Sequence, residues 1–120
     1  MENHHGMYDL RLIGTWRSDA RRTLREIGRR RDIPASKKSK LRRFFGKLEL
    51  RYTRTHCHAR LGDAVTVTRY TVVAKDSSSA AVVSLDPLAG RQISHIHFQG
   101  NWYWVSLGSG QMREFFKRIK

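Results

Sequence analysis

The sequence has little that would mark a secreted, membrane-spanning or disulfide-linked protein. Its 120 residues include one cysteine, Cys57, which excludes an internal disulfide framework and fits a reducing compartment. No apolar run approaches the roughly 20 residues of a membrane span, and residues 1–6 lack the apolar segment of a secretory signal. We therefore expect a cytoplasmic protein without membrane contact. Residues 7–120 would form a single domain, and 1–6 a flexible leader or cloning remnant.

Sequence motifs of known enzyme chemistry are also missing. The chain has no G-x-S-x-G elbow, Walker loop, C-x-x-C pair or H-E-x-x-H helix. Its few acidic residues show no pairing of the kind that glycosidases use. Only the histidines could support catalysis, so we expect a binding protein, and the sequence indicates no cofactor.

Negative charge is scarce as well, because 24 Lys and Arg face 10 Asp and Glu, which gives a net charge of +14. The excess peaks in the segment 29–43, where eight cations accompany one acid, Asp32. Such a cluster attracts phosphates and could bind nucleic acid or another polyanion. The alternative is a solvated helix face. The candidate polyanion-binding residues are Arg29, Arg30, Arg31, Lys37, Lys38, Lys40, Arg42 and Arg43.

The spacing of apolar residues predicts an α+β fold with an antiparallel meander of about six strands. The sheet would be strongly curved or closed into a small barrel. Two helices would follow the first strand, one after Ser18 and one between Ser36 and Gly46, and a C-terminal helix would begin at Ser109. A bulge is expected near Thr68 and Arg69. The predicted strands are 8–17, 47–60, 64–75, 80–85, 91–99 and 102–107.

The last predicted hairpin turns at Gly100-Asn101, which fixes its register. Phe98 and Tyr103 would share one face with Ile96, Val105 and Leu107, an ordinary core. The other face would carry polar and aromatic side chains, which suit either the wall of a cavity for a small organic ligand or a second core under a helix. The candidate ligand-binding residues on this basis are Tyr52, His95, His97, Trp102 and Trp104.

The histidines occur in pairs, two of which have His-x-His spacing. His56 with His58, and His95 with His97, would each place both rings on one face of a strand. Such pairs can hold zinc or copper, although they also occur as ordinary hydrogen-bonded strand residues. The four would meet only if the sheet closed into a barrel, so they are weak candidates and no metal site is assigned.

Gly14-Thr15-Trp16 resembles the G-x-W motif that opens the lipocalin/calycin superfamily. The runs 93–98 and 102–105 are similar to those of small uncharacterised bacterial lipocalin-like proteins. The resemblance implies a barrel in which Trp16 closes one end and a basic residue from late in the chain, Arg113 or Arg118, packs over it. A small hydrophobic or aromatic ligand would then be the expected partner.

Overall fold

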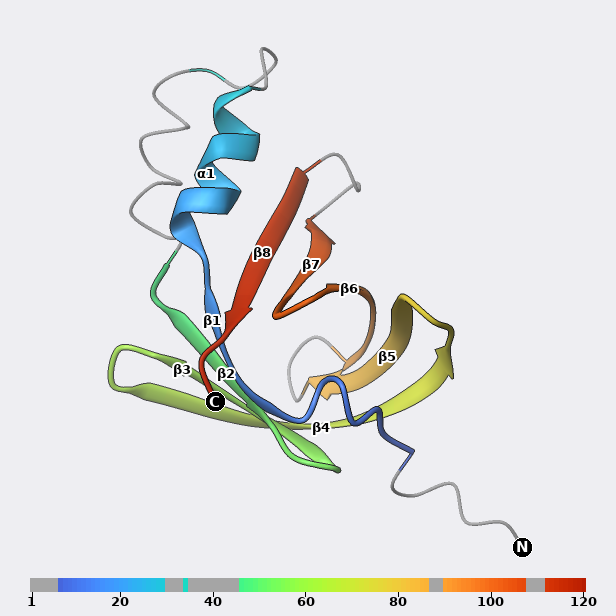
Figure 1. Cartoon of the computed structure of the whole chain (residues 1–120). Helices are drawn as coiled ribbons and strands as arrows, with labels where there is room; N and C mark the ends of the chain where they lie inside the picture. The colour runs from blue at the N-terminus through green and yellow to red at the C-terminus, as the bar shows by residue number, and fades with distance from the viewer. Residues whose placement is uncertain (1–6, 30–33, 35–45, 87–89, 108–111) are drawn as a thin grey trace, which may run out of the picture.

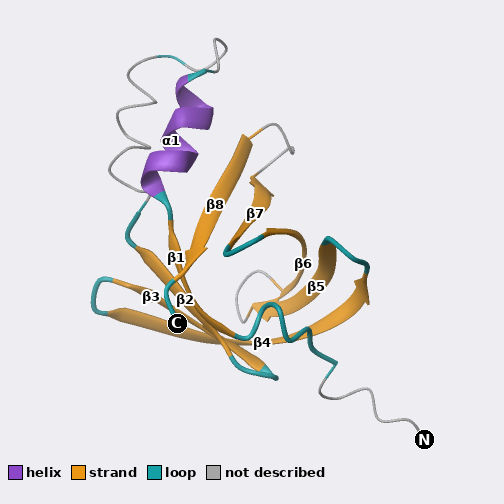
Figure 2. Cartoon of the chain, viewed as in Figure 1, coloured by secondary structure: helices purple, strands orange, loops and turns teal. Residues whose placement is uncertain are grey.

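The computed structural model describes residues 7–29, 34, 46–86, 90–107 and 112–120, and within them it contains eight strands and one helix (Figures 1 and 2). Each strand pairs antiparallel with the next, and the last pairs with the first, so the sheet closes into a barrel. The elements are β1 Gly14–Ser18, α1 Ala20–Gly28, β2 Leu48–Tyr52, β3 His56–Leu61, β4 Ala64–Lys75, β5 Ser79–Asp86, β6 Gly90–Gln99, β7 Trp102–Leu107 and β8 Met112–Arg118.

The predicted C-terminal helix is wrong, because this segment forms β8, the strand that closes the barrel. Phe115 and Phe116 are adjacent and therefore point to opposite sides of the wall. Phe116 packs into the core and Phe115 lies beneath α1, and both are almost fully buried. A strand covered on both faces can have apolar residues at helical spacing, which is why the spacing of apolar residues here predicted a helix.

Two predicted strand boundaries also change. The segment 47–60 is two strands, because residues 53–55 turn the chain between β2 and β3. The Thr53 hydroxyl accepts hydrogen bonds from the backbone N–H groups of Thr55 (3.3 Å) and His56 (3.0 Å), a turn without glycine or proline. The predicted strand 8–17 begins only at Gly14, because Leu12 N–H bonds back to Asp9 O in a turn. Eight strands therefore replace the expected six.

The final hairpin confirms its predicted register. Gln99, Phe98 and His97 pair with Trp102, Tyr103 and Trp104, and Gly100 has the positive φ of 62° that the turn requires. Strand β4 spans the predicted 64–75, although its register shift lies between Val72 and Ala74 and not near residues 68–69. The second inserted helix, expected at 36–46, lies almost entirely outside the described residues.

Beyond the end of β1, Asp19 and helix α1 provide further hydrogen bonds to the backbone of β8. Asp19 N–H bonds to Phe115 O at 2.8 Å, and Phe115 N–H bonds to the buried Thr23 hydroxyl at 2.9 Å. The backbone N–H and carbonyl of Phe115, which lie beyond the short pairing of β8 with β1, are thereby satisfied, and α1 lies beside β8 in Figure 1. No helix in the part of the chain that the structure describes is long and apolar enough to cross a membrane.

Candidate binding site in the barrel

One end of the barrel, here called the closed end, is sealed by Leu12, Trp16 and Arg118. Leu12 and Trp16 are 0% and 1% exposed, and the Trp16 indole N–H donates to Leu12 O at 2.9 Å. The Arg118 guanidinium lies 4.4 Å from the Trp16 ring centroid and donates to the carbonyls of Ile13 and Arg11. Arg118 thus occupies the place that the resemblance implied for a basic residue, whereas Arg113 lies on the outer surface.

Gly14 makes this seal possible. Its φ of 137° belongs to the region that favours glycine. A Cβ built there would lie 2.6 Å from the backbone oxygen of Lys120 and 2.4 Å from Nη1 of Arg118. The glycine of the G-x-W motif is therefore needed for the close approach of β1 to the end of the chain.

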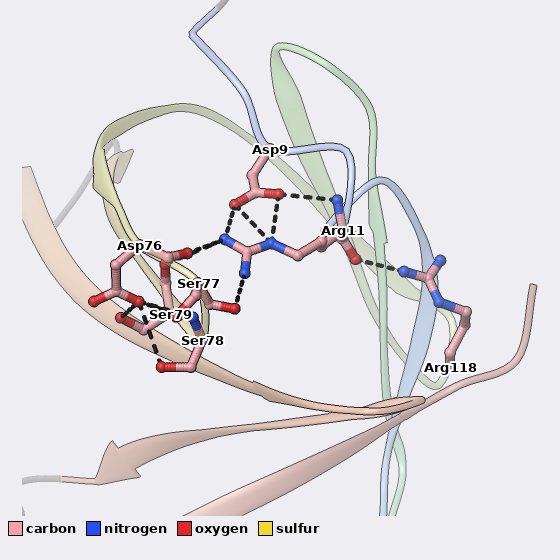
Figure 3. A network of polar contacts seen from close by, with 7 residues as sticks. All are labelled: Asp9, Arg11, Asp76, Ser77, Ser78, Ser79 and Arg118. Carbon is pink, nitrogen blue, oxygen red and sulfur yellow. Dashed lines mark hydrogen bonds and ion pairs between the residues drawn. The ribbon is translucent and has the colours of Figure 1, made fainter.

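A partly buried ion pair, Asp9 with Arg11, links the closed end to the turn between β4 and β5 (Figure 3). The Arg11 guanidinium binds both carboxylate oxygens of Asp9, whose side chain is 4% exposed. The same guanidinium donates to the carbonyls of Asp76 and Ser77, each at 2.9 Å. The hydrogen bonds from Arg11 hold the pKa of Asp9 below its ordinary value, so the pair stays ionised.

Above the seal, the inner wall carries a group of aromatic and polar side chains from different strands. Tyr103 packs edge-on against Trp16 with 4.7 Å between centroids, and its hydroxyl lies 3.3 Å from that of Tyr52. Cys57 is the cross-strand partner of Tyr52. Burial raises the pKa of Cys57 to about 11 and of Tyr70 to about 12, and it also raises the pKa values of Tyr52 and Tyr103 well above their ordinary value. At neutral pH these groups are uncharged donors and acceptors.

Glu114 is the carboxyl group on this inner wall. It alternates with Phe115 on β8, so it faces inward with Phe116, and it is 7% exposed. The Ser18 hydroxyl donates to Glu114 Oε2 at 2.9 Å and accepts from Gly46 N–H at 3.2 Å. Desolvation, only partly offset by the Ser18 hydrogen bond, raises the pKa of Glu114.

The opposite end of the barrel, here called the open end, has exposed side chains at inward-facing positions. Ser94 faces inward because it is paired with the buried Val82, and Gln92 because its partner Ser84 is paired with the buried Tyr70. Both Ser94 and Gln92 are exposed. Inward positions near the closed end are buried, so exposure rises along the barrel axis from one end to the other.

The predicted ligand-binding residues lie on two sides of the wall. Tyr52 faces the interior, whereas His97, Trp102 and Trp104 face outward, because they alternate with the buried Ile96 and Tyr103. His97 stacks on Trp104 with 3.9 Å between centroids and 10° between planes. His95 is also outward and exposed. The structure therefore brings His97 and Trp104 into contact on the outer side of the wall and places Tyr52 on the inner side.

The histidine pairs stay apart. His56 and His58 lie on β3, whereas His95 and His97 lie on β6, with β4 and β5 between them. Within the described ranges, no three His, Cys, Asp or Glu side chains lie close enough together to hold a metal ion. Of the eight predicted polyanion-binding residues, only Arg29 is described, and Arg30, Arg31, Lys37, Lys38, Lys40, Arg42 and Arg43 lie outside the described residues.

Comparisons of the chain with protein-family models, with curated proteins and with solved structures find no match. The fold itself defines the class: an eight-stranded, closed antiparallel barrel that is compatible with a calycin-like architecture.

Because the pKa of Glu114 is raised, we expect the ionisation of Glu114 to destabilise the folded protein as pH rises. The folded protein holds this proton above the ordinary value of 4.5, so the contribution of Glu114 to folding is most favourable below pH 4.5 and weakens as pH rises. Glu114→Gln keeps an acceptor for Ser18 and removes the ionisation. We expect urea unfolding to show the variant gaining stability relative to wild type from pH 4 to pH 7.5.

Glu49→Gln is the matched control, since salt bridges to Arg17 and Arg60 lower the pKa of this more exposed carboxyl. Its stability relative to wild type should change in the opposite direction over the same pH range. A Glu114→Gln variant whose difference from wild type does not vary with pH would contradict the desolvated interior position of this group.

Proposed function

We propose that the protein is a non-catalytic, lipocalin-like binding protein that takes a small organic ligand into its barrel through the open end. The observation that carries the proposal is the gradient of exposure along the inner wall. The closed end is filled by Leu12, Trp16 and Arg118, while the inward-facing Ser94 and Gln92 remain exposed at the other end. A barrel closed at one end and accessible at the other is suited to hold one small ligand.

The chemistry of the inner wall supports an organic ligand with an apolar body and a polar group. Aromatic rings of Tyr52, Tyr70 and Tyr103 supply apolar area, and the hydroxyls of Tyr52 and Tyr103 supply hydrogen bonds. Glu114 adds a carboxyl group, and Ser18 is its hydrogen-bond partner among the described residues. A few polar groups among apolar side chains are typical of small-molecule sites. The proposed cavity is therefore lined by side chains inside the barrel. Of the ligand-binding residues predicted from the sequence, Tyr52 alone belongs to this proposed lining.

The resemblance of Gly14-Thr15-Trp16 to the lipocalin entry motif also supports the proposal. Here the motif has a physical counterpart, since Trp16 is buried under Arg118 and Gly14 permits the close approach of the chain end. In a ligand-binding barrel this seal is what prevents the interior from opening at both ends.

A bulky side chain at the open end tests the proposal. The neutral fluorophore N-phenyl-1-naphthylamine, which brightens in apolar surroundings, serves as the ligand probe. We expect wild type to bind it and Ser94→Trp, with an indole placed at the mouth, to bind at least about tenfold more weakly, a difference of 1.4 kcal/mol.

His95→Trp is the matched control because His95 is the next residue, is also exposed and faces outward. It should bind the probe as wild type does. Failure of wild type to bind, or equal binding by wild type and Ser94→Trp, would contradict a ligand site reached through the open end.

A further inference from the structure

The outer surface of β7 and β8 carries alternating aromatic and cationic side chains next to α1. We call this the cation–aromatic face. Trp102 and Trp104 point outward from β7, and their cross-strand neighbours on β8 are Lys117 and Phe115. The residues that define the face are Arg22, Trp102, Trp104, Arg113, Phe115 and Lys117.

The cations of this face rest on the rings. The Arg22 guanidinium lies 4.8 Å from the centroid of Trp102 and 5.0 Å from that of Phe115, and Lys117 Nζ lies 5.4 Å from Trp102. Stacking holds an arginine in one conformation while its N–H groups stay free to bind an anion. Because stacking already orders these side chains in the free protein, binding of a ligand carries a smaller entropic cost.

Little negative charge neutralises the face. Arg113 is paired with Glu26, with Nε 2.9 Å from the carboxylate oxygen. Among the residues that the structure describes, neither Arg22 nor Lys117 forms an ion pair with a carboxylate. These two cations are thus available for an anion from outside the protein, whose chain carries a net charge of +14.

A groove of about 530 Å³ runs beside the face, where β1, α1 and β8 meet. Its charged lining is Arg17, Arg21 and Lys117 against one carboxylate, Asp19, and Trp102 lies at its border with the face. Arg17 lies directly opposite Lys117 on β1 and β8, and its guanidinium forms a salt bridge with Glu49 at 3.0 Å. Arg21 and Lys117 are therefore the groove cations that no carboxylate of the described residues neutralises in an ion pair.

We propose that the cation–aromatic face and its groove bind single-stranded nucleic acid, independently of any ligand in the barrel. The groove would take phosphates at Arg21 and Lys117, and a base would stack on Trp102 in place of one of the two cations that contact this ring. Interleaved cations and aromatic rings are the usual means of sequence-tolerant single-strand binding.

Fluorescence anisotropy with a labelled 12-nucleotide oligo(dT) tests this proposal. Wild type should bind with a strong salt dependence, and Arg22→Ala/Lys117→Ala should bind at least about tenfold more weakly in low salt with a shallower salt slope. The control Arg69→Ala/Lys75→Ala removes the same charge from exposed positions on β4 and should lose under about threefold.

Substitutions of Trp102 test whether base stacking contributes to binding in addition to the attraction between positive charge and any polyanion. Trp102→Leu should weaken oligo(dT) binding at least about fivefold, the lower range for loss of one stacked base, and leave heparin binding unchanged. Trp102→Phe, which keeps a ring, should retain most of the affinity, and oligo(dT) should quench tryptophan fluorescence in wild type. Equal loss in both charge variants, equal affinity for duplex DNA, or the absence of quenching would overturn the proposal.

Discussion

Replacing Trp16 with alanine is expected to destabilise the protein by about 3–5 kcal/mol, the range for removing a fully buried aromatic side chain. Trp16 is 1% exposed and contacts the rings of Tyr103 and the guanidinium of Arg118. Its loss would leave a cavity at the closed end and the indole's partner, Leu12 O, without its hydrogen bond. The measurement is the free energy of unfolding from urea titration followed by circular dichroism.

Trp104→Ala provides the matched control, because it removes the same side chain from the outer surface of β7. Trp104 is partly exposed and contacts His97 and Arg113. Its removal should cost under about 2 kcal/mol, since less apolar area is withdrawn from water. Equal costs for the two substitutions would contradict the assignment of Trp16 as the central residue of the closed end.

Arg11→Ala is expected to cost about 2–4 kcal/mol, because it leaves the Asp9 carboxylate buried without its partner. Arg11 binds Asp9 and also donates to the carbonyls of Asp76 and Ser77, so its loss releases the β4–β5 turn from the N-terminal segment as well (Figure 3). Arg11 further covers the ring of Phe98 at 4.5 Å. The cost is again measured as the free energy of unfolding in urea.

The pH dependence distinguishes the buried charge from lost packing. In wild type the pKa of Asp9 is lowered, so its ionisation stabilises the fold above the ordinary value of 3.8 and this contribution is lost as pH falls below it. In Arg11→Ala the unpaired carboxyl should favour its neutral form, and stability relative to wild type should recover between pH 7 and pH 5.

Asp9→Asn/Arg11→Ala removes the charge together with its partner and should recover part of the stability lost in Arg11→Ala at pH 7. A double variant that is no more stable than Arg11→Ala, with no recovery at pH 5, would show that Arg11 acts only through its carbonyl contacts.

The closed end could be anticipated from the sequence, whereas the inner wall could not. Gly14-Thr15-Trp16 indicated a sealed barrel with a basic residue over Trp16, and Arg118 has that role. The register of the last hairpin was also correct, because a two-residue turn at Gly100-Asn101 leaves one alignment. The hairpin register follows from the local geometry of its turn, whereas the seal was implied by the resemblance of Gly14-Thr15-Trp16 to the lipocalin motif.

Glu114 was missed because β8 was predicted as a helix. Phe115 and Phe116 fit helical spacing, and only the tertiary covering of Phe115 by α1 explains two adjacent buried rings on a strand. The alternation of Glu114, Phe116 and Arg118 at every second residue was the available signal for a strand. It would have placed the carboxyl beside Tyr103 and Val105 on the inner wall.

The sequence predicted that the strand face with His95, His97, Trp102 and Trp104 forms either the wall of a cavity or a second core under a helix. In the structure, cations cover the two tryptophans: Arg22 and Lys117 contact Trp102, and Arg113 contacts Trp104. Long basic side chains shield aromatic area while their charged ends remain in water. Sequence alone does not show which cations from α1 and β8 lie above these rings, since that depends on how the helix docks.

Native mass spectrometry of protein isolated from its own cells would show whether the barrel interior holds a small ligand. An additional small-molecule mass is expected on wild type and on His95→Trp, and it should be absent from Ser94→Trp expressed in the same cells. A wild-type protein with no bound small molecule, or one whose bound molecule persists in Ser94→Trp, would contradict binding through the open end.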